Sequence, residues 1–570
     1  MGAMPIESLR DDRLAKRSAF AETLSTARYL LLVAAPLGAL VGVAIAAYDW
    51  TVNELLWKHV TAQPLWIQLA SPTVAMLLAG LILQLFRVRS SSMADEVVKA
   101  YHEPAVGMPT ETALAKLFAS IATMGFGASA GMEGASKWLG ATIGSLLQTG
   151  LNKLKINQVR WSVRSTMLTG GSAGIAAIFR APLSGAIMGV ESPYKQDLAH
   201  DALLSSLVAA ATSFWAFTRL RPATPYFPVT FHYELSSRDL LIAVPLGIAA
   251  GLASHLFLGA LGGVRNGFAR LPIPIVIRNL IGGLALTAIA FAAYEIVGKP
   301  VTLQAGLPVA NDLLNGRYVF ALCLVIFALK LLATAITFGA GGVGGLFVPT
   351  ATIGAALGAC FDAVLAPSHP GVYTLLGIAA FAGASYNSLL FAAVFIAEST
   401  GNVFLAAPAL IASTFAFIVS AGVSNSRSQK SRRPGLDERL AEVLISDLMI
   451  KKVVSVGPAQ TLETFSRGVL LEHHHKALPV RDAEGKLLGM IGLRQLGSVP
   501  QSEWSMRLIE TVMDVKAPSL SPTQNAQELE LALARSAYPA IAIVDDEGKL
   551  IGVAGLADLH RARGGFAGQT

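Results

Sequence analysis

A lone carboxylate, Glu133, is the residue of this sequence whose chemistry most needs a partner. It lies in the stretch SAGMEGASKW (129–138), between Gly131 and Gly134, with long apolar runs on both sides. Burying a carboxylate without a partner in such surroundings costs several kcal/mol. The local fold must therefore supply groups that stabilise negative charge, or else keep this residue as a neutral structural acid.

A second glycine-rich stretch, GGVGGLFVP (341–349), contains groups that can stabilise negative charge. Glycines at the start of a helix let backbone N–H groups face a cavity, and helix N-termini carry a partial positive charge. Such a site suits a small anion because it attracts the ion without a fixed full charge that would trap it. The alternative for a glycine-rich membrane segment is close packing between helices.

The elements that must position these groups are membrane helices. The chain has 570 residues, of which 53% are hydrophobic and 14% charged, which is too apolar for an ordinary soluble protein. Residues 64–86, 240–264 and 370–397 contain no Asp, Glu, Lys or Arg, and each is long enough to cross a hydrocarbon core of about 30 Å. Shorter glycine-rich pieces are expected to be broken or half-spanning helices. The sequence therefore predicts a polytopic protein of the lipid bilayer.

The net charge of +7 is explained by basic residues that flank the membrane part. They precede the first span over 10–28 and follow the last over 427–433, so the positive-inside rule places both termini in the cytoplasm. A bacterial inner (plasma) membrane is the expected location. The basic residues are not interleaved with aromatics, so no nucleic-acid partner is predicted. Cys323 and Cys360 lie in apolar segments and predict neither a disulfide nor a metal site.

The chain changes character near residue 425. SNSRSQKSRRPG (424–435) is a basic, serine-rich linker, and the tail after it repeats itself: DAEGKLLGMIGLRQL (482–496) returns 63 positions later as DDEGKLIGVAGLADL (545–559). Each copy has the pattern of a strand, a turn, a strand and a helix start, and the tail resembles a tandem pair of CBS domains. The expected boundaries are 1–27 for a cytoplasmic segment, 28–424 for the membrane domain, 425–440 for the linker, and 441–499 and 505–566 for the two CBS domains.

Adenosine-nucleotide binders of the CBS family carry a hydroxyl residue and then an Asp after the final strand. The matching positions are Gly492 and Gln495 in the first copy, and Gly555 and Asp558 in the second. Asp558 alone keeps the ribose-binding type, so it is the candidate for an adenosine nucleotide, and no other cofactor is required. The alternative is a dimerisation or gating platform. The histidines at 473–475 are expected to end a solvated helix, because no further metal ligands stand around them.

Weak repetition also runs through the membrane part. RAPLSGAIMGVES (180–192) is similar to NSLLFAAVFIAES (387–399), which places Glu191 and Glu398 at an offset of 207. GMEGA (131–135) has a counterpart in GLFVP at an offset of 214. Two similar offsets predict two structural halves, related by inversion, with the functional site at their interface.

Four motifs in order, GASAGMEGAS, AIFRAPLSGAIMGVE, LKLLATAITFGAGGVGGLFVP and the CBS pair, resemble the CLC family of chloride channels and proton/chloride exchangers. The resemblance covers the chain from about residue 25 to its end. It implies an all-α polytopic membrane domain of two inverted helical halves, followed by a soluble α+β CBS pair. It also implies a homodimer with one chloride pathway in each subunit.

The resemblance gives Glu133 a role as the gate of that pathway. In the family, the matching carboxylate occupies the anion site while it is charged, and it leaves when it is protonated or displaced. The amides of Leu346 and Phe347 are the implied donors, and the same amides would satisfy the carboxylate. The implied anion-binding residues are Ser92, Gly131, Met132, Gly134, Leu346 and Phe347.

Ser92 is placed by matching SSMADEVVKAY (91–101) to a Gly-Ser-Gly-x-Pro-Glu string of the family, with Glu96 fixing the register. Both flanking glycines and the proline are missing here. A slip of one residue would put Met93 at the anion, and loss of the serine is associated with fluoride-type members, which as a rule lack CBS domains. The alternative is that the serines at 90–92 cap a helix.

The proton path also departs from the family pattern. The exchangers usually carry two successive carboxylates after the apolar helix, whereas this chain has Glu191 followed by Ser192. Both residues are candidates for the proton path, with Ser192 at the place of the internal proton acceptor. A hydroxyl cannot store a proton near neutral pH as a carboxylate can. The sequence therefore predicts weak or absent proton coupling.

The two ends of the anion site also depart from the family pattern. Met132 and Ala135 replace the usual Arg and Pro around the gate, and Lys137 is expected to supply positive charge near the outer vestibule. A tyrosine is expected after the last span to close the site from inside, but 423–431 has none, and a serine or glutamine stands nearest. An inner end that stays open would favour channel-like conduction.

We therefore expect chloride transport gated by Glu133, with channel-like or weakly proton-coupled conduction, in a protein that is not an enzyme. The alternatives are a coupled proton/chloride antiporter and, less favoured, a fluoride exporter or a CBS-regulated divalent-cation transporter. A cation pathway needs carboxylates in its spans, and this membrane part has few, chiefly Glu133, Glu191, Glu295 and Glu398. An anchored enzyme is disfavoured because no nucleophile elbow, phosphate loop or metal-ligand spacing occurs.

Overall fold

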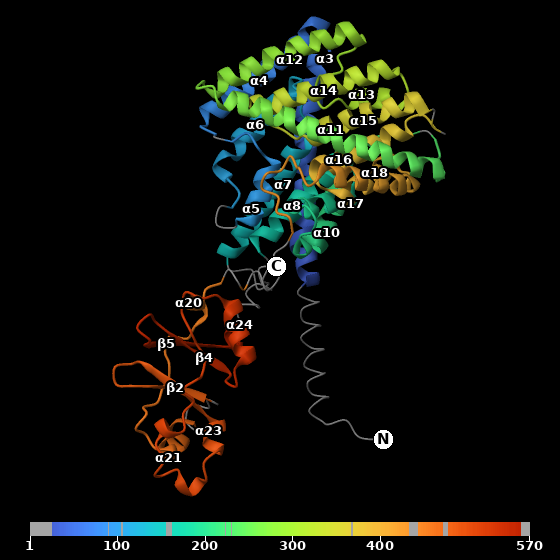
Figure 1. Ribbon diagram of the computed structural model, residues 1–570. Helices are drawn as coiled ribbons and strands as arrows, with labels where there is room; N and C mark the ends of the chain where they lie inside the picture. The colour runs from blue at the N-terminus through green and yellow to red at the C-terminus, as the bar shows by residue number, and fades with distance from the viewer. Residues whose placement is uncertain are drawn as a thin grey trace. The chain divides into compact units, whose positions relative to one another are not determined.

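The chain forms two compact units, Met1–Arg433 and Pro434–Thr570, which are seen in Figure 1. The division falls within the predicted basic linker. The computed structural model describes residues 26–88, 90–103, 107–154, 162–222, 224–229, 231–365, 367, 369–432, 440, 443–470 and 477–559.

The described part of the first unit is helical, as its apolar composition predicts. Eight of its described helical segments are long and apolar enough to cross a membrane. Two further apolar helices, of 15 and 12 residues, are too short to span it, as expected for half-spanning segments. The helices are α2 (Ala35–Trp50), α3 (Lys58–Thr61), α4 (Leu65–Leu85), α5 (Ala94–His102), α6 (Ala113–Gly125), α7 (Glu133–Lys153), α8 (Val163–Phe179), α9 (Pro182–Glu191), α10 (Leu203–Leu220), α11 (Ser237–Ala269), α12 (Ile275–Val297), α13 (Leu307–Leu314), α14 (Phe320–Ala340), α15 (Phe347–Leu365), α16 (Val372–Tyr386), α17 (Leu389–Thr400) and α18 (Ala406–Ser420).

The helices fall into two halves with matching packing. α2 packs against α10 in the first half, and α11 packs against α18 in the second. α4 and α12, which meet across the halves, lie side by side in Figure 1. The hydroxyls of Thr73 and Thr287, which are 214 positions apart, share a hydrogen bond of 2.8 Å between these two helices. The offset read from the sequence therefore does mark corresponding positions of two helical halves.

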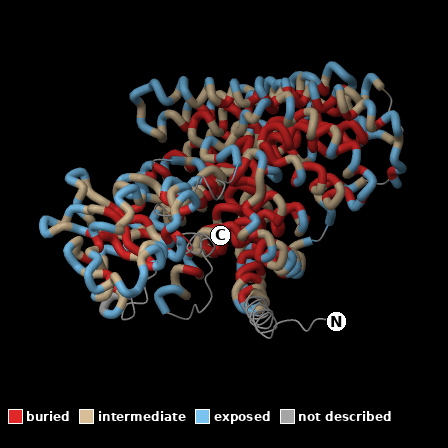
Figure 2. The backbone as a smooth tube through the Cα atoms, turned by 60° about the horizontal axis from the view of Figure 1, so that its bottom comes forward, coloured by how far each residue is buried: buried red, intermediate tan, exposed pale blue. Residues whose placement is uncertain are grey.

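The interior of this unit is built from two close helix pairs, α7 with α8 and α15 with α16. A Cβ at Gly140 would collide with the carbonyl oxygen of Gly170, and one at Gly354 with that of Gly377. Both crossings therefore require glycine, which lets the backbones approach. Figure 2 shows the buried residues gathered in the interior of the unit, with exposed residues on its outer helices.

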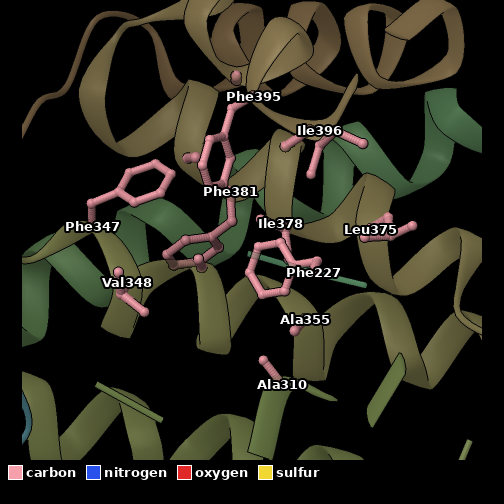
Figure 3. Close-up of a cluster of buried hydrophobic side chains, with 14 of the residues drawn as sticks. Phe227, Ala310, Phe347, Val348, Ala355, Leu375, Ile378, Phe381, Phe395 and Ile396 are labelled. Atoms are coloured by element: carbon pink, nitrogen blue, oxygen red, sulfur yellow. The ribbon is translucent and has the colours of Figure 1, made fainter. Parts of the chain in front are cut away.

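Aromatic rings pack around the start of α15. The ring of Phe347 lies 4.8 Å from that of Phe179 and 5.1 Å from those of Phe391 and Phe395, measured between centroids. Figure 3 shows Phe347 and Phe395 among the buried hydrophobic side chains of this cluster. Because α8, α15 and α17 all contribute rings, the cluster fixes the position of the α15 N-terminus. That N-terminus belongs to the glycine-rich stretch singled out from the sequence.

The second unit contains two similar strand pairs, as the repeat predicts. β1 and β2 are antiparallel, with Ala477 opposite Gly492, and β4 and β5 are antiparallel, with Ala540 opposite Gly555. β3 is parallel to β4. Corresponding residues are 63 positions apart in both ladders, and a bulge occurs at the same place in each. The described elements are α20 (Ile445–Leu448), α21 (Leu462–Thr464), β1 (Ala477–Arg481), β2 (Leu487–Gly492), α23 (Leu493–Gly497), β3 (Ser519–Leu520), α24 (Ala526–Arg535), β4 (Ala540–Val544) and β5 (Leu550–Gly555).

The two copies pack as one module through reciprocal backbone bonds. The N–H of Leu487 donates to the carbonyl of Gly548 at 3.0 Å, and the N–H of Leu550 donates to the carbonyl of Gly485 at 2.9 Å. These two bonds are related by the same offset of 63. The soluble α+β pair expected from the sequence is therefore confirmed.

Candidate anion site

Two helices of the membrane unit begin at the same place. α7 begins at Glu133 and α15 at Phe347, and just before them Gly131 and Gly345 form a short antiparallel bridge. The N–H of Gly131 donates to the carbonyl of Gly345 at 2.8 Å, and the reverse bond is 2.6 Å long. A Cβ on either glycine would collide with the Glu133 carboxylate. The bridge therefore needs glycine, and it brings the free N–H groups of α15 to the start of α7.

The carboxylate of Glu133 lies on the N-terminus of α15. Its Oε1 accepts hydrogen bonds from the backbone N–H groups of Phe347 and Val348, the second at 3.3 Å. Its Oε2 has no hydrogen-bond partner among the described residues, although the residue is only 3% exposed. The helix terminus adds a partial positive charge. Backbone amides alone thus hold this anionic group, and they leave half of it unsatisfied.

The donors differ by one residue from those implied by the family resemblance. The sequence predicts the amides of Leu346 and Phe347, whereas the structure has those of Phe347 and Val348 on the carboxylate. The reason is that α15 begins at Phe347, so its first unsatisfied N–H groups belong to Phe347 and Val348. Leu346 precedes the helix and lines a cavity instead.

That cavity, of about 390 Å³, opens beside Glu133. It is lined by residues from several helices and from the segment after α18. The residues predicted for the site that line it are Ser92, Glu133, Gly134, Ser192 and Leu346. Its charged lining side chains are Asp95, Glu133, Lys137, Arg265, Arg278 and Arg427. The structure therefore brings most of the predicted site to one place, with more positive than negative charge around it.

Ser92 lies at this cavity, just before α5. Its side-chain hydroxyl takes part in no hydrogen bond found in the described structure, and its carbonyl accepts a bond of 3.0 Å from Lys116 Nζ. Lys116 also pairs with Glu96. The helix-capping alternative is not seen, because Met93 is the N-cap residue and α5 has no side-chain cap. Ser92 is held in place by Lys116 with its hydroxyl available, and the buried Met93 lines the same cavity.

Met132, the N-cap residue of α7 just before Glu133, contacts a polar cluster. Asn53 Nδ2 lies 3.9 Å from its sulfur and donates to Asp49 at 2.8 Å. Gln304 donates to Asn53 at 3.3 Å, and Arg221 pairs with Asp49 at 2.6 Å. The positive charge of this cluster therefore belongs to Arg221, which is already paired with Asp49, and not to the residue before Glu133.

Glu191 and Glu398 cap each other's helices. Glu191, at the end of α9, accepts from the backbone N–H groups of Leu390 at 3.1 Å and Phe391 at 3.0 Å, in the first turn of α17. Glu398, in α17, accepts from the N–H groups of Leu183 at 3.0 Å and Ser184 at 2.7 Å in the first turn of α9. The repeat that relates the two glutamates thus builds a reciprocal contact. Glu191 uses both oxygens as a cap, which argues against a part in a proton path.

Ser192 follows Glu191 and contacts a buried lysine. Its Oγ donates to the carbonyl of Gly189 at 3.0 Å and accepts a hydrogen bond of 2.7 Å from Lys137 Nζ. Lys137, whose positive charge is expected near the outer vestibule, contacts Ser192 in the structure. Because it lies one helical turn beyond Glu133, its side chain reaches the end of α9 instead.

Tyr386 is a cavity residue that the sequence reasoning missed. It ends α16 and lines the cavity, and its ring lies 5.8 Å from that of Phe347. Asn387, which follows, has a positive φ of 50°, just as Arg180 after Phe179 has a φ of 55°. These pairs are 207 positions apart, so the repeat offset was the signal that could have found this residue. The tyrosine that lines this cavity thus comes from the end of α16 and not from the segment after the last span.

The segment after α18 forms part of the wall of this cavity. Gln429 is buried, and its Nε2 donates to the carbonyls of Ser192 at 3.2 Å, Tyr194 at 2.8 Å and Tyr386 at 3.2 Å. It is therefore a fixed part of the cavity wall, together with Ser426.

In the CBS unit, Asp558 is a buried cap. Its Oδ2 accepts a hydrogen bond of 2.8 Å from the N–H of Gly555, at the end of β5. The matching Gln495 of the first copy accepts from Gly492 at 3.1 Å and donates to the Tyr538 hydroxyl at 2.7 Å. Burial and a hydrogen bond to a carboxylate raise the pKa of Tyr538 to about 12. Asp558, the candidate nucleotide-binding residue, is thus already engaged by the N–H of Gly555.

Metal ligands do not gather in the part of the chain that the structure describes. No group of three or more His, Cys, Asp or Glu side chains there could hold a metal ion. The histidines at 473–475, expected to end a solvated helix, lie outside the described residues.

Comparison with known proteins identifies the membrane unit. A family model described as voltage gated chloride channel matches residues 74–421. The chain belongs to this family. Its members are channels and transporters, not enzymes, and the eight apolar helices make this one a membrane protein. The model of the CBS domain matches residues 445–496 and 509–565, which confirms the tandem pair.

Some relatives within the family are named as channels and others as exchange transporters. The chain is 26% identical over 415 residues to the voltage-gated ClC-type chloride channel ClcB of Salmonella dublin, covering 68% of this chain and 95% of that one. It is 25% identical over 310 residues to the H(+)/Cl(-) exchange transporter ClcA of Vibrio vulnificus, covering 53% and 65%. The crystal structure of a eukaryotic CLC transporter shares the fold, with a TM-score of 0.60 and 18% identity over 94% of this chain and 98% of that one.

Proposed function

We propose that the protein transports chloride through the cavity beside Glu133, and that this carboxylate is the gate. The contact between Glu133 Oε1 and the amides of Phe347 and Val348 carries the proposal. A carboxylate oxygen and a chloride ion need the same partners, namely N–H donors and a positive helix terminus. The charged side chain therefore occupies the position that an anion would take.

Gate opening follows from the unsatisfied half of the carboxylate. When Glu133 is protonated, its attraction to the α15 terminus falls, and the side chain can leave the amides. Chloride then takes the two N–H groups as a site without a fixed full charge, from which it can depart. The Ser92 hydroxyl and the Tyr386 ring, which line the same cavity, supply further contacts along the pathway.

Channel-like or weakly proton-coupled conduction is the favoured mechanism. Ser192 stands where a second acid would hold a proton, and Glu191 is engaged with the start of α17. The carboxylates that line the cavity within the described residues are Glu133 and Asp95. Coupled proton/chloride antiport, the function named for the Vibrio relative, is the alternative.

Two other substrates receive less support. A divalent-cation pathway needs carboxylates or carbonyls around the ion, whereas four basic and two acidic side chains line this cavity. A fluoride exporter is suggested by Met93, which lines the cavity next to Ser92. The available hydroxyl of Ser92 favours chloride.

We also propose a homodimer in a bacterial inner (plasma) membrane with both termini in the cytoplasm, because of the family resemblance and the flanking basic residues. Cross-linking in membrane vesicles tests the dimer, since a single species at the monomer mass would contradict it. Protease treatment of sealed vesicles of known orientation tests the side on which the termini lie.

For the CBS pair we propose at most a weak adenosine-nucleotide site at Asp558, since that carboxylate is buried and caps the N–H of Gly555. ATP should then raise the melting temperature of the wild-type protein slightly, and of Asp558→Asn less. No shift at millimolar ATP would leave the pair as a gating or dimerisation platform.

The proposed function is tested in liposomes loaded with potassium chloride, by recording chloride efflux and external pH together. We expect efflux with little or no pH change, and efflux without any pH change in Glu133→Ala. Glu295→Ala, which removes an exposed carboxylate from α12, is the control. Alkalinisation that accompanies efflux and is lost in Glu133→Ala would favour the antiporter. If neither chloride nor fluoride moves, the proposal is overturned.

A further inference from the structure

Lys137 is a buried positive charge in the wall of the cavity. It lies on α7 four residues after Glu133, so the two side chains project from the same face of the helix. Both line the cavity, and Lys137 is only 4% exposed. A lysine held out of water in this way needs a counter-charge or a full set of hydrogen-bond acceptors.

The protein does not supply that set within the described residues. Lys137 Nζ has one hydrogen-bond acceptor there, the Ser192 hydroxyl at 2.7 Å, and it makes no ion pair. An ammonium group has three donors, so two remain without a protein acceptor. Lys116, the neighbouring buried lysine, shows the contrast, because it pairs with Glu96 and also donates to the carbonyl of Ser92.

The cavity carboxylates are engaged elsewhere. Asp95 accepts from the Ser426 hydroxyl at 2.6 Å, and from the N–H and hydroxyl of Ser428 at 3.0 and 3.1 Å. Glu133 is held by the N-terminus of α15. Three arginines add positive charge to the same cavity, and they are Arg265, Arg278 and Arg427. Asp95 acts on Lys137 through space, but neither cavity carboxylate forms an ion pair with it among the described residues, and the four basic side chains of the lining exceed the two acidic ones.

We propose that the ammonium group of Lys137, positioned by Ser192, binds a second small monovalent anion in this cavity, one helical turn from the gate. The inference rests on the proposed function of the cavity as a chloride pathway. Two anion positions in a row suit conduction, because an ion arriving at one weakens the hold on the other.

The proposal also gives a reason for the serine at 192. The Ser192 hydroxyl orients Lys137 by a hydrogen bond and leaves its charge available. A carboxylate at this position would form an ion pair with Lys137 and compete with the anion. The residue that weakens proton coupling is thus the one that keeps the second anion site open.

The test uses crystals of the whole protein grown in bromide, whose anomalous scattering locates halide ions. We expect a bromide peak in contact with Lys137 Nζ in the wild type, and none there in Lys137→Met or Ser192→Glu. The control is Lys330→Met, since Lys330 is an equally buried lysine whose Nζ donates to the carbonyls of Thr302 and Gln304 and which does not line the cavity. The peak beside Lys137 should persist in this control.

A flux measurement covers the case in which Lys137→Met does not fold. Ser192→Glu keeps the lysine and should lower the apparent chloride affinity of efflux by about tenfold. Absence of bromide at Lys137 in the wild type, or an unchanged affinity in Ser192→Glu, would overturn the inference. If chloride efflux still depends on Glu133 in that case, the proposed function survives. Bromide at Lys137 without any anion efflux would support the subsite and overturn the proposed function.

Discussion

Three carboxylates in the membrane unit lie on the N-termini of helices from the opposite half, but they are not equally satisfied. Glu191 and Glu398 use both oxygens to bind backbone amides of α17 and α9. Glu133 uses one oxygen on α15 and leaves the other without a partner in the described structure. Glu133 also lines the cavity, and the other two do not. The amides of a helix N-terminus therefore satisfy both oxygens of two of these carboxylates and only one oxygen of the third.

The difference in hydrogen bonding fits the roles proposed for these carboxylates. A fully hydrogen-bonded carboxylate is costly to remove, because its departure would leave several amides buried and unsatisfied. Glu191 and Glu398 each accept two backbone hydrogen bonds from a helix of the opposite half, and together they hold the two halves to each other. The gating role proposed for Glu133 requires that its carboxylate be released at a modest cost, which an anion binding to the same amides would reduce.

The largest effect is expected from Gly345→Ala, which would remove the difference by displacing the gate. The new methyl group would collide with the Glu133 carboxylate and the N–H of Gly134. We expect chloride flux to fall by at least about tenfold and the melting temperature to fall as well, because overpacking costs about 1–3 kcal/mol. Gly259→Ala on α11, where a methyl meets nothing within 4 Å, is the control. Normal flux in Gly345→Ala would mean that the start of α15 is not tightly packed around the gate.

The second-largest expected effect is a loss of thermal stability. Glu398→Ala removes the acceptor of two backbone N–H groups and of the Ser184 hydroxyl at the start of α9. A loss of about 3 kcal/mol is expected, since hydrogen bonds to a charged group are worth about 1.5–3 kcal/mol each and water compensates in part. Thermal unfolding in detergent measures it, with the exposed Glu295→Ala as control. If Glu398→Ala and Glu295→Ala unfold at the same temperature, the reciprocal caps do not stabilise the contact between the halves.

The smallest effect is expected in the CBS unit. Asp558→Ala removes one buried acceptor from the N–H of Gly555 and should cost about 1 kcal/mol, as the loss of a helix cap does. Asp546→Ala, an exposed turn residue in the same copy, should be neutral. A thermal unfolding curve of the full protein, followed through the CBS transition, compares the two. An unchanged curve for Asp558→Ala would show that the residue is not a cap and would favour a ligand-binding role.

Much of this arrangement could be predicted from the sequence because it depends on residue type and on the spacing of residues along the chain. The apolar runs predicted the membrane helices, the glycine-rich stretch 341–349 predicted backbone N–H groups that face a cavity, and the offset of 63 predicted two matching strand pairs. The offset of 207 also paired Glu191 with Glu398. The sequence did not reveal that these two glutamates cap each other's helices, because that depends on how the halves are oriented.

Other parts of the site could not be predicted because they depend on where helices begin and end. The shift from Leu346 to Val348 as a donor follows from the residue at which α15 starts. Tyr386 reaches the cavity because α16 ends there, although in sequence it is one more apolar residue of a span. Lys137 of α7 contacts Ser192, which follows α9, through a tertiary contact that no local sequence pattern records.

The most direct test of the gating role of Glu133 is chloride flux into liposomes as a function of pH, for the wild type and for Glu133→Gln. In the proposed mechanism, the charged Glu133 carboxylate occupies the amides of Phe347 and Val348, and protonation would release it. Wild-type flux should therefore rise as the pH falls, whereas Glu133→Gln, which cannot become charged, should be open and insensitive to pH. Equal pH dependence in the two proteins would contradict the claim that Glu133 is the gate.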